Sequence, residues 1–296
     1  MRVTGIQMRD VATIIVSFNC REVLRECLRS LPAGSEVVVV DNAAADGTAE
    51  MVRTEFPSIL LIANNTNRGF AAACNQGIEA SDGEFVLLLN PDAFLDSRAL
   101  ETLLRVMRTY PTVGACGPRI LNTDGTLQLS CRAFPTLWLL VCDELRLSAL
   151  FGSRGWFRGY RMSAGPLDKT REVDQLMGSC LLLRRPTLEQ VGPLDERFFV
   201  YFEEVDLCRR LKDVGWGVLF VHDAVITHIG GQSSKTDSRA SLHYRYASLF
   251  AYFQKYSPGW RVTALRSVVQ IGAVLRWLAG QREYGTIACE VWRLAR

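Results

Sequence analysis

Short apolar runs alternate with amphipathic segments through the first ninety residues of the chain. The apolar runs have the length of buried strands, whereas the segments between them place their apolar residues on one helical face. This alternation is typical of an α/β fold with a Rossmann-like, mostly parallel central sheet that is flanked by helices. The expected strands span residues 11–18, 37–40, 59–63 and 85–89, and the expected helices span residues 21–31, 46–55 and 69–80.

Polar residues follow each of these four apolar runs directly. In an open parallel sheet the carboxyl ends of the strands meet at one edge, and such sheets bind their ligands there. One polar cluster at the end of a strand carries little information, but four in succession predict a binding edge. The clusters are Asn19, Asp41 with Asn42, Asn64 with Asn65, and Asn90 with Asp92.

The rest of the chain has a less regular pattern. Residues 135–174 show neither a helical nor a strand period, which predicts an inserted loop. Residues 242–296 are predicted to form a helical C-terminal extension. The other expected elements are helices over 98–110 and 203–214 and strands over 113–121, 178–184 and 218–226.

The net charge of +3 over 296 residues is too small to attract nucleic acid. The positive excess lies in residues 261–296, which carry six arginines against two glutamates together with Trp277 and Trp292. Arginine, tryptophan and an apolar face are typical of a helix at a membrane interface. They fit a helix packed on the catalytic domain or on a second subunit equally well, so peripheral membrane contact and a homodimer both stay open.

The sequence also bears on the expected location. No apolar stretch approaches the ~20 residues that a bilayer requires, and the first ten residues lack the apolar core of a secretory signal. The nine cysteines include no closely spaced pair and are expected to be reduced and mostly buried. We therefore expect a cytoplasmic protein, either free or associated with the inner face of the cytoplasmic membrane.

Two common nucleotide-binding signatures are absent. Ser17-Phe18-Asn19 stands after the first run in place of Gly-x-Gly-x-x-Gly, which argues against a dinucleotide-dependent dehydrogenase, and no P-loop follows any run. A nucleotidyltransferase would use the same sheet edge and a metal, but it would need a glycine-rich basic loop after the first run, which the sequence lacks.

Asn90-Pro91-Asp92 is the strongest local candidate for chemistry. A hydrophobic strand delivers both side chains to a turn that Pro91 fixes. Such oxygen ligands suit a hard divalent cation that keeps water and phosphate oxygens as its other ligands. The same tripeptide is also a common turn.

Three carboxylates, Glu203, Glu204 and Asp206, lie where an aromatic run meets the start of a helix. Acids in a first helical turn are stabilised by the helix dipole in any protein. Aromatic neighbours also desolvate a carboxylate and raise its basicity, as a general base requires. His228 follows an expected strand and precedes a glycine-rich segment, which makes it a candidate ligand.

Taken together, these motifs resemble those of the bacterial family-2 glycosyltransferases, and of their rhamnosyltransferase-like branch in particular. The resemblance covers roughly residues 11–234. It implies the GT-A fold, a nucleotide-diphosphate sugar donor, a divalent metal, Mn²⁺ or Mg²⁺, and inversion at the anomeric carbon. The motifs are Asp41-Asn42 with Asp46-Gly47, Asn67-Arg68-Gly69-Phe70-Ala71, Asn90-Pro91-Asp92, Gly178-Ser179-Cys180, Phe199-Val200-Tyr201-Phe202-Glu203-Glu204-Val205-Asp206 and His228-Ile229-Gly230-Gly231.

The resemblance also implies a role for individual residues. Asp41 matches a contact to the nucleobase, Asp92 and His228 match the metal ligands, and Glu204 matches the catalytic base. The chain departs from the broad family by Asn90 in place of Asp and by Glu204 in place of the Asp of a Glu-Asp pair. Glu203 or Asp206 could therefore share the role of base. The other residues expected to bind the donor are Ser17, Asn19, Arg68, Asn90, Gly178 and, closing over the diphosphate, Lys235 and Arg239.

The implied division of the chain is a GT-A catalytic domain over 1–241 and a helical segment over 242–296. Within the catalytic domain, residues 11–95 would bind the nucleotide sugar and residues 96–241 the acceptor. The resemblance favours dTDP-rhamnose as the donor, with UDP-sugars next, and a glycan or lipid-linked acceptor in the synthesis of cell-surface polysaccharide. Because of the departures at Asn90 and Glu204, an inactive binding partner with the same fold stays open as an alternative.

Overall fold

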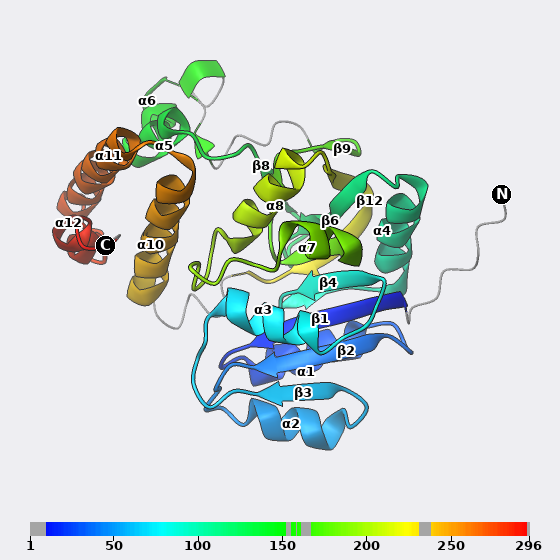
Figure 1. Cartoon of the computed structure of the whole chain (residues 1–296). Helices are drawn as coiled ribbons and strands as arrows, with labels where there is room; N and C mark the ends of the chain where they lie inside the picture. The colour runs from blue at the N-terminus through cyan, green and yellow to red at the C-terminus, as the bar shows by residue number, and fades with distance from the viewer. Residues whose placement is uncertain (1–9, 152–154, 158, 161–166, 231–237, 295–296) are drawn as a thin grey trace.

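The computed structural model describes residues 10–151, 155–157, 159–160, 167–230 and 238–294. At its centre lies one large sheet with the strand order β3-β2-β1-β4-β11-β6-β12-β5 (Figure 1). Strands β1 to β4 are parallel to one another, and β11 runs antiparallel between β4 and β6. The α/β class, the mostly parallel sheet and the four expected N-terminal strands are thereby confirmed.

The bounds of the strands follow the apolar runs of the sequence closely. The main strands are β1 (Val11–Ser17), β2 (Glu36–Asp41), β3 (Leu60–Ala63), β4 (Phe85–Leu89), β6 (Val113–Leu121), β11 (Cys180–Arg184) and β12 (Gly217–His228). The short strands are β5 (Ala93–Phe94), β7 (Leu127–Gln128), β8 (Cys131–Arg132), β9 (Arg171–Glu172) and β10 (Gln175–Leu176).

The helices fall where the amphipathic segments predict them, with further helices in the second half of the chain. Those of the catalytic region are α1 (Arg21–Ser30), α2 (Thr48–Glu55), α3 (Phe70–Glu79), α4 (Ser97–Thr109), α5 (Leu137–Glu144), α6 (Leu147–Phe151), the 3-10 helix η2 (Gly155–Phe157), α7 (Arg185–Val191) and α8 (Glu203–Asp213). The C-terminal helices are α10 (Ser238–Tyr256), α11 (Gly259–Leu278) and α12 (Tyr284–Glu290).

The central sheet is covered by helices on both faces, so its inner strands such as β1 and β4 are buried on both sides, whereas the edge strand β3 is partly exposed. Val11 and Ile15 of β1 point into a core shared with α1, α2 and α4. Ala12 and Ile14, the alternate residues of the same strand, point into the core shared with α3, α7 and α8. This two-sided burial explains why the strands read as continuous apolar runs rather than as alternating patterns.

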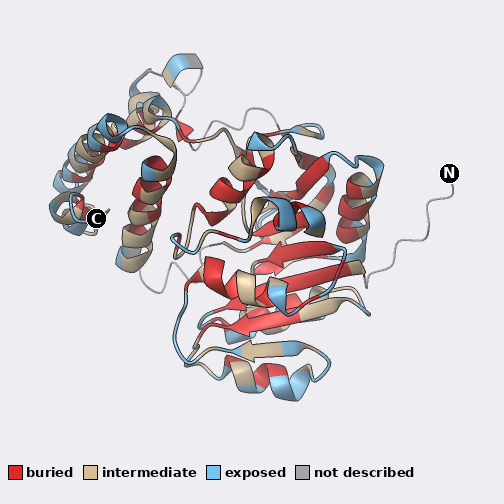
Figure 2. Ribbon diagram, in the orientation of Figure 1, coloured by how far each residue is buried: buried red, intermediate tan, exposed pale blue. Residues whose placement is uncertain are grey.

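A third core lies away from the sheet, where α10, α11 and α12 pack together with α5 (Figures 1 and 2). Tyr246, Phe250 and Phe253 of α10 are among its buried side chains. Helix α10 begins at Ser238, four residues before the helical extension predicted from the sequence. None of the described helices is both long and apolar enough to cross a bilayer.

The prediction of an irregular insertion over 135–174 is wrong for its first part, which forms α5 and α6. Helix α5 packs against α11. Its sequence from Leu137 to Cys142 is apolar on all sides, and a helix that is apolar all round shows no amphipathic period. The packing against the C-terminal helices therefore hides the helical signal.

Candidate functional site

A cavity of about 850 Å³ opens at the carboxyl end of β4. The sheet contributes Asp92 and His228 to its lining, and the first turn of α8 contributes Glu203 and Glu204. A further wall comes from α5 and the C-terminal helices, including Tyr246. Residues that are far apart in the sequence therefore meet in one space, as the predicted binding edge requires.

Asp92 and His228 lie next to each other, because β5 and the end of β12 pair antiparallel beside the Asn90–Asp92 turn. Nε2 of His228 is 3.1 Å from Oδ1 of Asp92 and 3.4 Å from Nδ2 of Asn90. All three side chains line the cavity. The structure thus brings together both predicted metal ligands and the neighbouring amide.

Gln128 of β7 fixes the orientation of the His228 ring. Its Nε2 donates to the carbonyl oxygen of His228 at 3.0 Å and to Oδ1 of Asn122 at 2.6 Å. Its Oε1 must then accept, and it lies 2.9 Å from Nδ1 of His228. A proton on Nδ1 leaves the Nε2 lone pair of the neutral ring facing Asp92.

Two sets of lone pairs 3.1 Å apart repel each other unless a proton or a cation lies between them. One carboxylate oxygen and one imidazole nitrogen at this separation suit a divalent cation that takes its remaining ligands from phosphate and water. Among the described residues, no group of three or more His, Cys, Asp or Glu side chains is placed to hold an ion. The pair therefore fits an ion shared with a phosphorylated ligand and not an all-protein metal site.

The acid pair Glu203-Glu204 begins α8 in an unusual backbone conformation. Tyr201 and Phe202, the two residues before it, have φ angles of 69° and 71°. Non-glycine residues in this left-handed region cost on the order of 1–3 kcal/mol each and cluster at functional sites. Ser248 of α10 supports the segment, since its hydroxyl donates to the carbonyl oxygen of Val200 at 2.8 Å.

Each carboxylate of the pair has an oxygen without a hydrogen-bond partner among the described residues. These oxygens are Oε2 of Glu203 and Oε2 of Glu204. Burial raises the pKa of Glu203 well above its ordinary value, and the neighbouring Glu204 charge raises it further. Burial also raises the pKa of Glu204, but backbone hydrogen bonds and the positive charge of Arg132 oppose that rise. The Arg132 charge therefore favours the ionised form of Glu204.

Gly178 keeps one side of Glu204 open. A Cβ atom at this position would lie 3.6 Å from Cβ and 3.8 Å from Cδ of Glu204, so any side chain here would cover part of the carboxylate. The neighbouring Ser179 holds the Asn90–Asp92 turn, since its carbonyl oxygen accepts from the backbone N–H of Asn90 at 2.9 Å. The Gly178-Ser179 motif thus connects the two chemical centres of the cavity.

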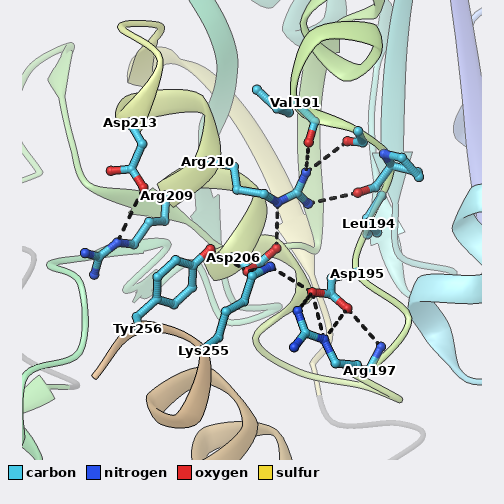
Figure 3. A network of polar contacts seen from close by, with 12 residues as sticks. Val191, Leu194, Asp195, Arg197, Asp206, Arg209, Arg210, Asp213, Lys255 and Tyr256 are labelled. Carbon is cyan, nitrogen blue, oxygen red and sulfur yellow. Dashed lines mark hydrogen bonds and ion pairs between the residues drawn. The ribbon is translucent and has the colours of Figure 1, made fainter. Parts of the chain in front are cut away.

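Asp206, by contrast, does not line the cavity. It is fully buried and lies in a network of charged side chains (Figure 3). Its carboxylate accepts from Nε of Arg210 at 2.7 Å, from Nζ of Lys255 at 2.6 Å and from the Tyr256 hydroxyl at 2.7 Å. These contacts tie the first turn of α8 to the end of α10.

The polar residues at the ends of β1 and β2 lie in two loops that contact each other. Asp41 is buried, and its Oδ1 accepts from the N–H of Ala44 at 3.1 Å. Oδ1 of Asn19 accepts from the N–H of Ala45 at 2.8 Å, which holds the two loops together. Burial raises the pKa of Asp41.

Asn42, the second residue of the Asp41-Asn42 motif, organises the next loop. Its Nδ2 donates to Oδ1 of Asn67 at 2.8 Å, and its Oδ1 accepts from the N–H of Arg68 at 3.0 Å. Gly69 then packs so closely on Phe199 that a Cβ atom would lie 2.6 Å from the Phe199 carbonyl oxygen. The loop after β3 is therefore fixed against the segment that leads to the acid pair.

The predicted donor-binding residues are not all at the cavity. Asn90 and Gly178 line it, whereas Asn19, Asp41 and Arg68 belong to the neighbouring loops outside its lining. The other three predicted residues are Ser17, which is enclosed with its hydroxyl 3.2 Å from Sγ of Cys20, Arg239, which is exposed in the first turn of α10, and Lys235, which lies outside the described residues.

The sequence reasoning also missed the helical wall of the cavity. Arg245 and Tyr246 of α10 and Arg276 of α11 line it, although they lie beyond the motifs that predicted the site. Arginines on amphipathic helices are commonly solvated, so these positions give no signal before the helices are folded against α5.

The sequence profile of the family "Glycosyl transferase family 2" matches residues 12–191. The chain is 30% identical over 285 residues to an N-acetylglucosaminyl-diphospho-decaprenol L-rhamnosyltransferase from Mycobacterium tuberculosis, covering 91% of this chain and 92% of that protein. It is 27% identical over 230 residues to a low-salt glycan biosynthesis hexosyltransferase, Agl10, from Haloferax volcanii, covering 76% and 69% of the two chains.

Solved structures show the same fold. A mannosyltransferase from Pyrobaculum calidifontis in complex with GDP-Man and Mn²⁺ superposes with a TM-score of 0.56 at 19% identity, covering 96% of this chain and 84% of that one. GalNAc-T7 with UDP, GalNAc and Mn²⁺ superposes with a TM-score of 0.54 at 15% identity, covering 74% and 42%. The predicted GT-A fold is confirmed.

Proposed function

Because the chain belongs to glycosyl transferase family 2 and is a glycosyltransferase, we propose that it transfers rhamnose from a nucleotide-diphosphate sugar with inversion and with the help of a divalent metal. The observation that carries this proposal is the meeting of Asp92 and His228 with the uncompensated pair Glu203-Glu204 in one cavity. The nucleotidyltransferase alternative falls with the family assignment.

The donor diphosphate would bind at the sheet edge. Asp92 and His228 would hold Mn²⁺ or Mg²⁺, and an imidazole ligand favours Mn²⁺. When bound, the ion neutralises the charge that develops on the leaving nucleoside diphosphate. Asp41 and Asn19, at the ends of β2 and β1, would contact the nucleoside, with Arg68 on the neighbouring loop. The Mn²⁺ and nucleotides in the superposed structures support this assignment.

Glu204 is the proposed catalytic base. A sugar hydroxyl is a weak nucleophile, so a carboxylate must accept its proton as the oxygen attacks the anomeric carbon from the face opposite the diphosphate. Glu204 ionises before Glu203 because backbone N–H groups and Arg132 stabilise its charge. Glu203, with its more strongly raised pKa, stays protonated beside it and limits the like-charge repulsion.

The proposed acceptor is a lipid-linked diphosphate that carries N-acetylglucosamine, as in the name of the mycobacterial relative, which is similar over nearly its whole length. dTDP-rhamnose is the favoured donor, with UDP-sugars as the next choice. Synthesis of a cell-surface polysaccharide is the process in which such an acceptor is consumed.

A lipid-linked acceptor fits an exposed apolar stripe on α11. Ile271, Val274, Leu275 and Leu278 follow the i, i+3, i+4, i+7 spacing of one helical face and are 37–69% exposed. Arginines outnumber glutamates six to two in residues 261–296, so the segment would complement an anionic surface. We place the peripheral membrane contact on this stripe.

Sedimentation with vesicles of phosphatidylglycerol and phosphatidylcholine tests this contact. We expect the wild type to sediment with the vesicles and Leu275→Gln/Leu278→Gln to stay in solution. Val214→Gln, an exposed apolar position outside the C-terminal segment, serves as the control. The contrary result is a wild type that does not bind the vesicles but sediments as a dimer, while the double variant sediments as a monomer. That result would assign the stripe to contact with a second copy of the chain.

The decisive test of the function is transfer of rhamnose from dTDP-rhamnose with Mn²⁺, together with donor binding followed by thermal shift. A ligand that binds the native state raises the melting temperature by mass action, so dTDP with Mn²⁺ should raise that of the wild type. The Asp92→Ala variant should lose the Mn²⁺-dependent part of the rise, and the exposed control Asp82→Ala should keep it. If the wild type binds dTDP equally well with and without Mn²⁺, Asp92 does not act as a metal ligand in donor binding. Metal-dependent binding without transfer or donor hydrolysis would point to an inactive partner.

A further inference from the structure

The wall of the cavity formed by β8, α5, the α5–α6 turn and the C-terminal helices is cationic. Its arginines come from four separate segments of the chain, which only the tertiary fold brings together. Arg146 lies in the turn between α5 and α6 with a φ angle of 53°, an uncommon conformation for arginine. The charged residues of this wall are Arg132, Arg146, Arg245 and Arg276 against Asp143 and Glu144.

Glu144 is already occupied within the protein. Glu144 accepts from Nη1 of Arg276 at 2.7 Å and from the Tyr246 hydroxyl at 3.0 and 3.1 Å. Among the described residues, Arg132, Arg146 and Arg245 form no salt bridge, so the wall keeps an excess of positive charge.

The guanidinium groups of Arg132 and Arg245 are also partly withdrawn from water, whereas Arg146 is exposed. Nε of Arg132 is buried without a hydrogen-bond partner among the described residues, and its guanidinium lies 5.6 Å from the ring centre of Tyr160. The guanidinium of Arg245 lies 5.2 Å from the ring centre of Tyr246. Burial of Nε of Arg132 without a hydrogen-bond partner among the described residues is costly, and an anionic ligand would offset that cost.

We propose that Arg132, Arg146 and Arg245 bind the diphosphate of the acceptor, an inference that rests on the proposed function. The donor diphosphate has its own place at Asp92 and His228, which β4 and β12 supply. The arginines come from other elements, and Arg132 is the cation whose charge is felt by Glu204. They are therefore placed to hold an anion on the acceptor while its hydroxyl reaches the base.

The chemistry of the wall matches this ligand. A diphosphate with both ends esterified keeps one negative charge on each phosphate, and guanidinium groups bind such oxygens through paired N–H donors. Leu150 and Phe151, exposed on α6 directly after Arg146, offer an apolar surface beside the cavity for the first units of a lipid chain. The wall would thus select a lipid-linked diphosphate over a neutral glycoside.

Two acceptors that differ only in the diphosphate test the inference: farnesyl-diphospho-N-acetylglucosamine and farnesyl N-acetylglucosaminide. In calorimetric titrations without donor, we expect the wild type to bind the first at least about tenfold more tightly than the second. Arg146→Gln and Arg245→Gln should each weaken binding of the diphosphate acceptor about tenfold to a hundredfold. Binding of the glycoside and of dTDP with Mn²⁺ should stay within about twofold.

Arg282→Gln, at an exposed position outside the cavity lining, is the matched control and should change neither affinity. Arg146 is exposed, so Arg146→Gln should fold normally. It therefore provides the test if Arg245→Gln fails to fold. Equal affinity of the wild type for the two acceptors overturns the inference. So does a result in which the arginine variants lose affinity for dTDP with Mn²⁺ and keep their affinity for the diphosphate acceptor. Preference for the diphosphate acceptor without rhamnose transfer would refute the proposed function and leave this site standing.

Discussion

Helix α8 places carboxylates from one turn in two opposite electrostatic surroundings. On the cavity side, Glu203 and Glu204 have no salt bridge to a described cation, and burial raises the pKa of each. On the other side, Asp206 accepts from Arg210, Lys255 and Tyr256 and is fully enclosed. The same kind of side chain thus lines the cavity without a cationic partner among the described residues in one place, where we propose proton transfer, and holds two helices together in the other.

The difference lies in how the charge is compensated. A buried carboxylate with two cationic partners has its electron pairs already engaged, so it is poorly placed to accept a proton from a substrate. A buried carboxylate without such partners is more basic and can accept a proton from a substrate hydroxyl. Chemical reactivity on α8 therefore follows the absence of partners, and structural support follows their presence.

The largest expected effect is on catalysis by Glu204→Gln. The amide keeps the shape of the side chain but cannot accept the proton, so we expect the rate of sugar transfer to fall by about 10²–10⁴-fold. The affinity for dTDP with Mn²⁺ should be unchanged in a thermal-shift titration. Substantial residual turnover would move the role of base to Glu203.

The next effect is on stability, through Asp206→Asn. Removing the Asp206 charge leaves the partly buried Arg210 without its anion and Lys255 with Asp195 alone, and we expect a loss of about 3 kcal/mol in the free energy of unfolding measured in urea. Asp213→Asn is the control, since that carboxylate is 61% exposed on the same helix and its pair with Arg209 should contribute less than about 1 kcal/mol. If Asp206→Asn folds with undiminished stability but loses transfer activity, Asp206 belongs with the catalytic acids.

The smallest effect is a change in pH dependence caused by Glu203→Gln. Because the pKa of Glu203 is raised in the folded protein, its contribution to stability is full below the ordinary pKa of a glutamate. That contribution is lost as the pH rises toward the higher folded value. The variant cannot ionise, so it should gain stability over the wild type, on the order of 1 kcal/mol, at pH 8 but not at pH 4. Urea unfolding at both pH values measures this gain, with the exposed Glu26→Gln as the control; an equal difference at both pH values would contradict the raised pKa.

Much of the fold was predictable because its signals are local. The strands β1 and β4 and most of β2 are buried on both faces and so appear as uninterrupted apolar runs, and the edge strand β3 is also apolar in sequence although it is partly exposed. The ends of the same runs located Asp41, Asn90 and Asp92 at the sheet edge, since parallel strands share their direction. The helix α5 was missed because a helix enclosed on all sides lacks the two-faced pattern by which helices are recognised.

The sequence by itself determined the parallel sheet, the polar residues at its carboxyl edge and the acid pair at the start of α8, because each depends on neighbours a few positions away. Only the tertiary structure decided which of the three acids at the start of α8 face the cavity, how Gln128 orients His228 and that the C-terminal arginines line the same space. Asp206 meets Lys255 across 49 positions of the chain, and His228 meets Gln128 across 100. Contacts at such separations arise only when packed cores bring distant segments together, and no local pattern encodes them.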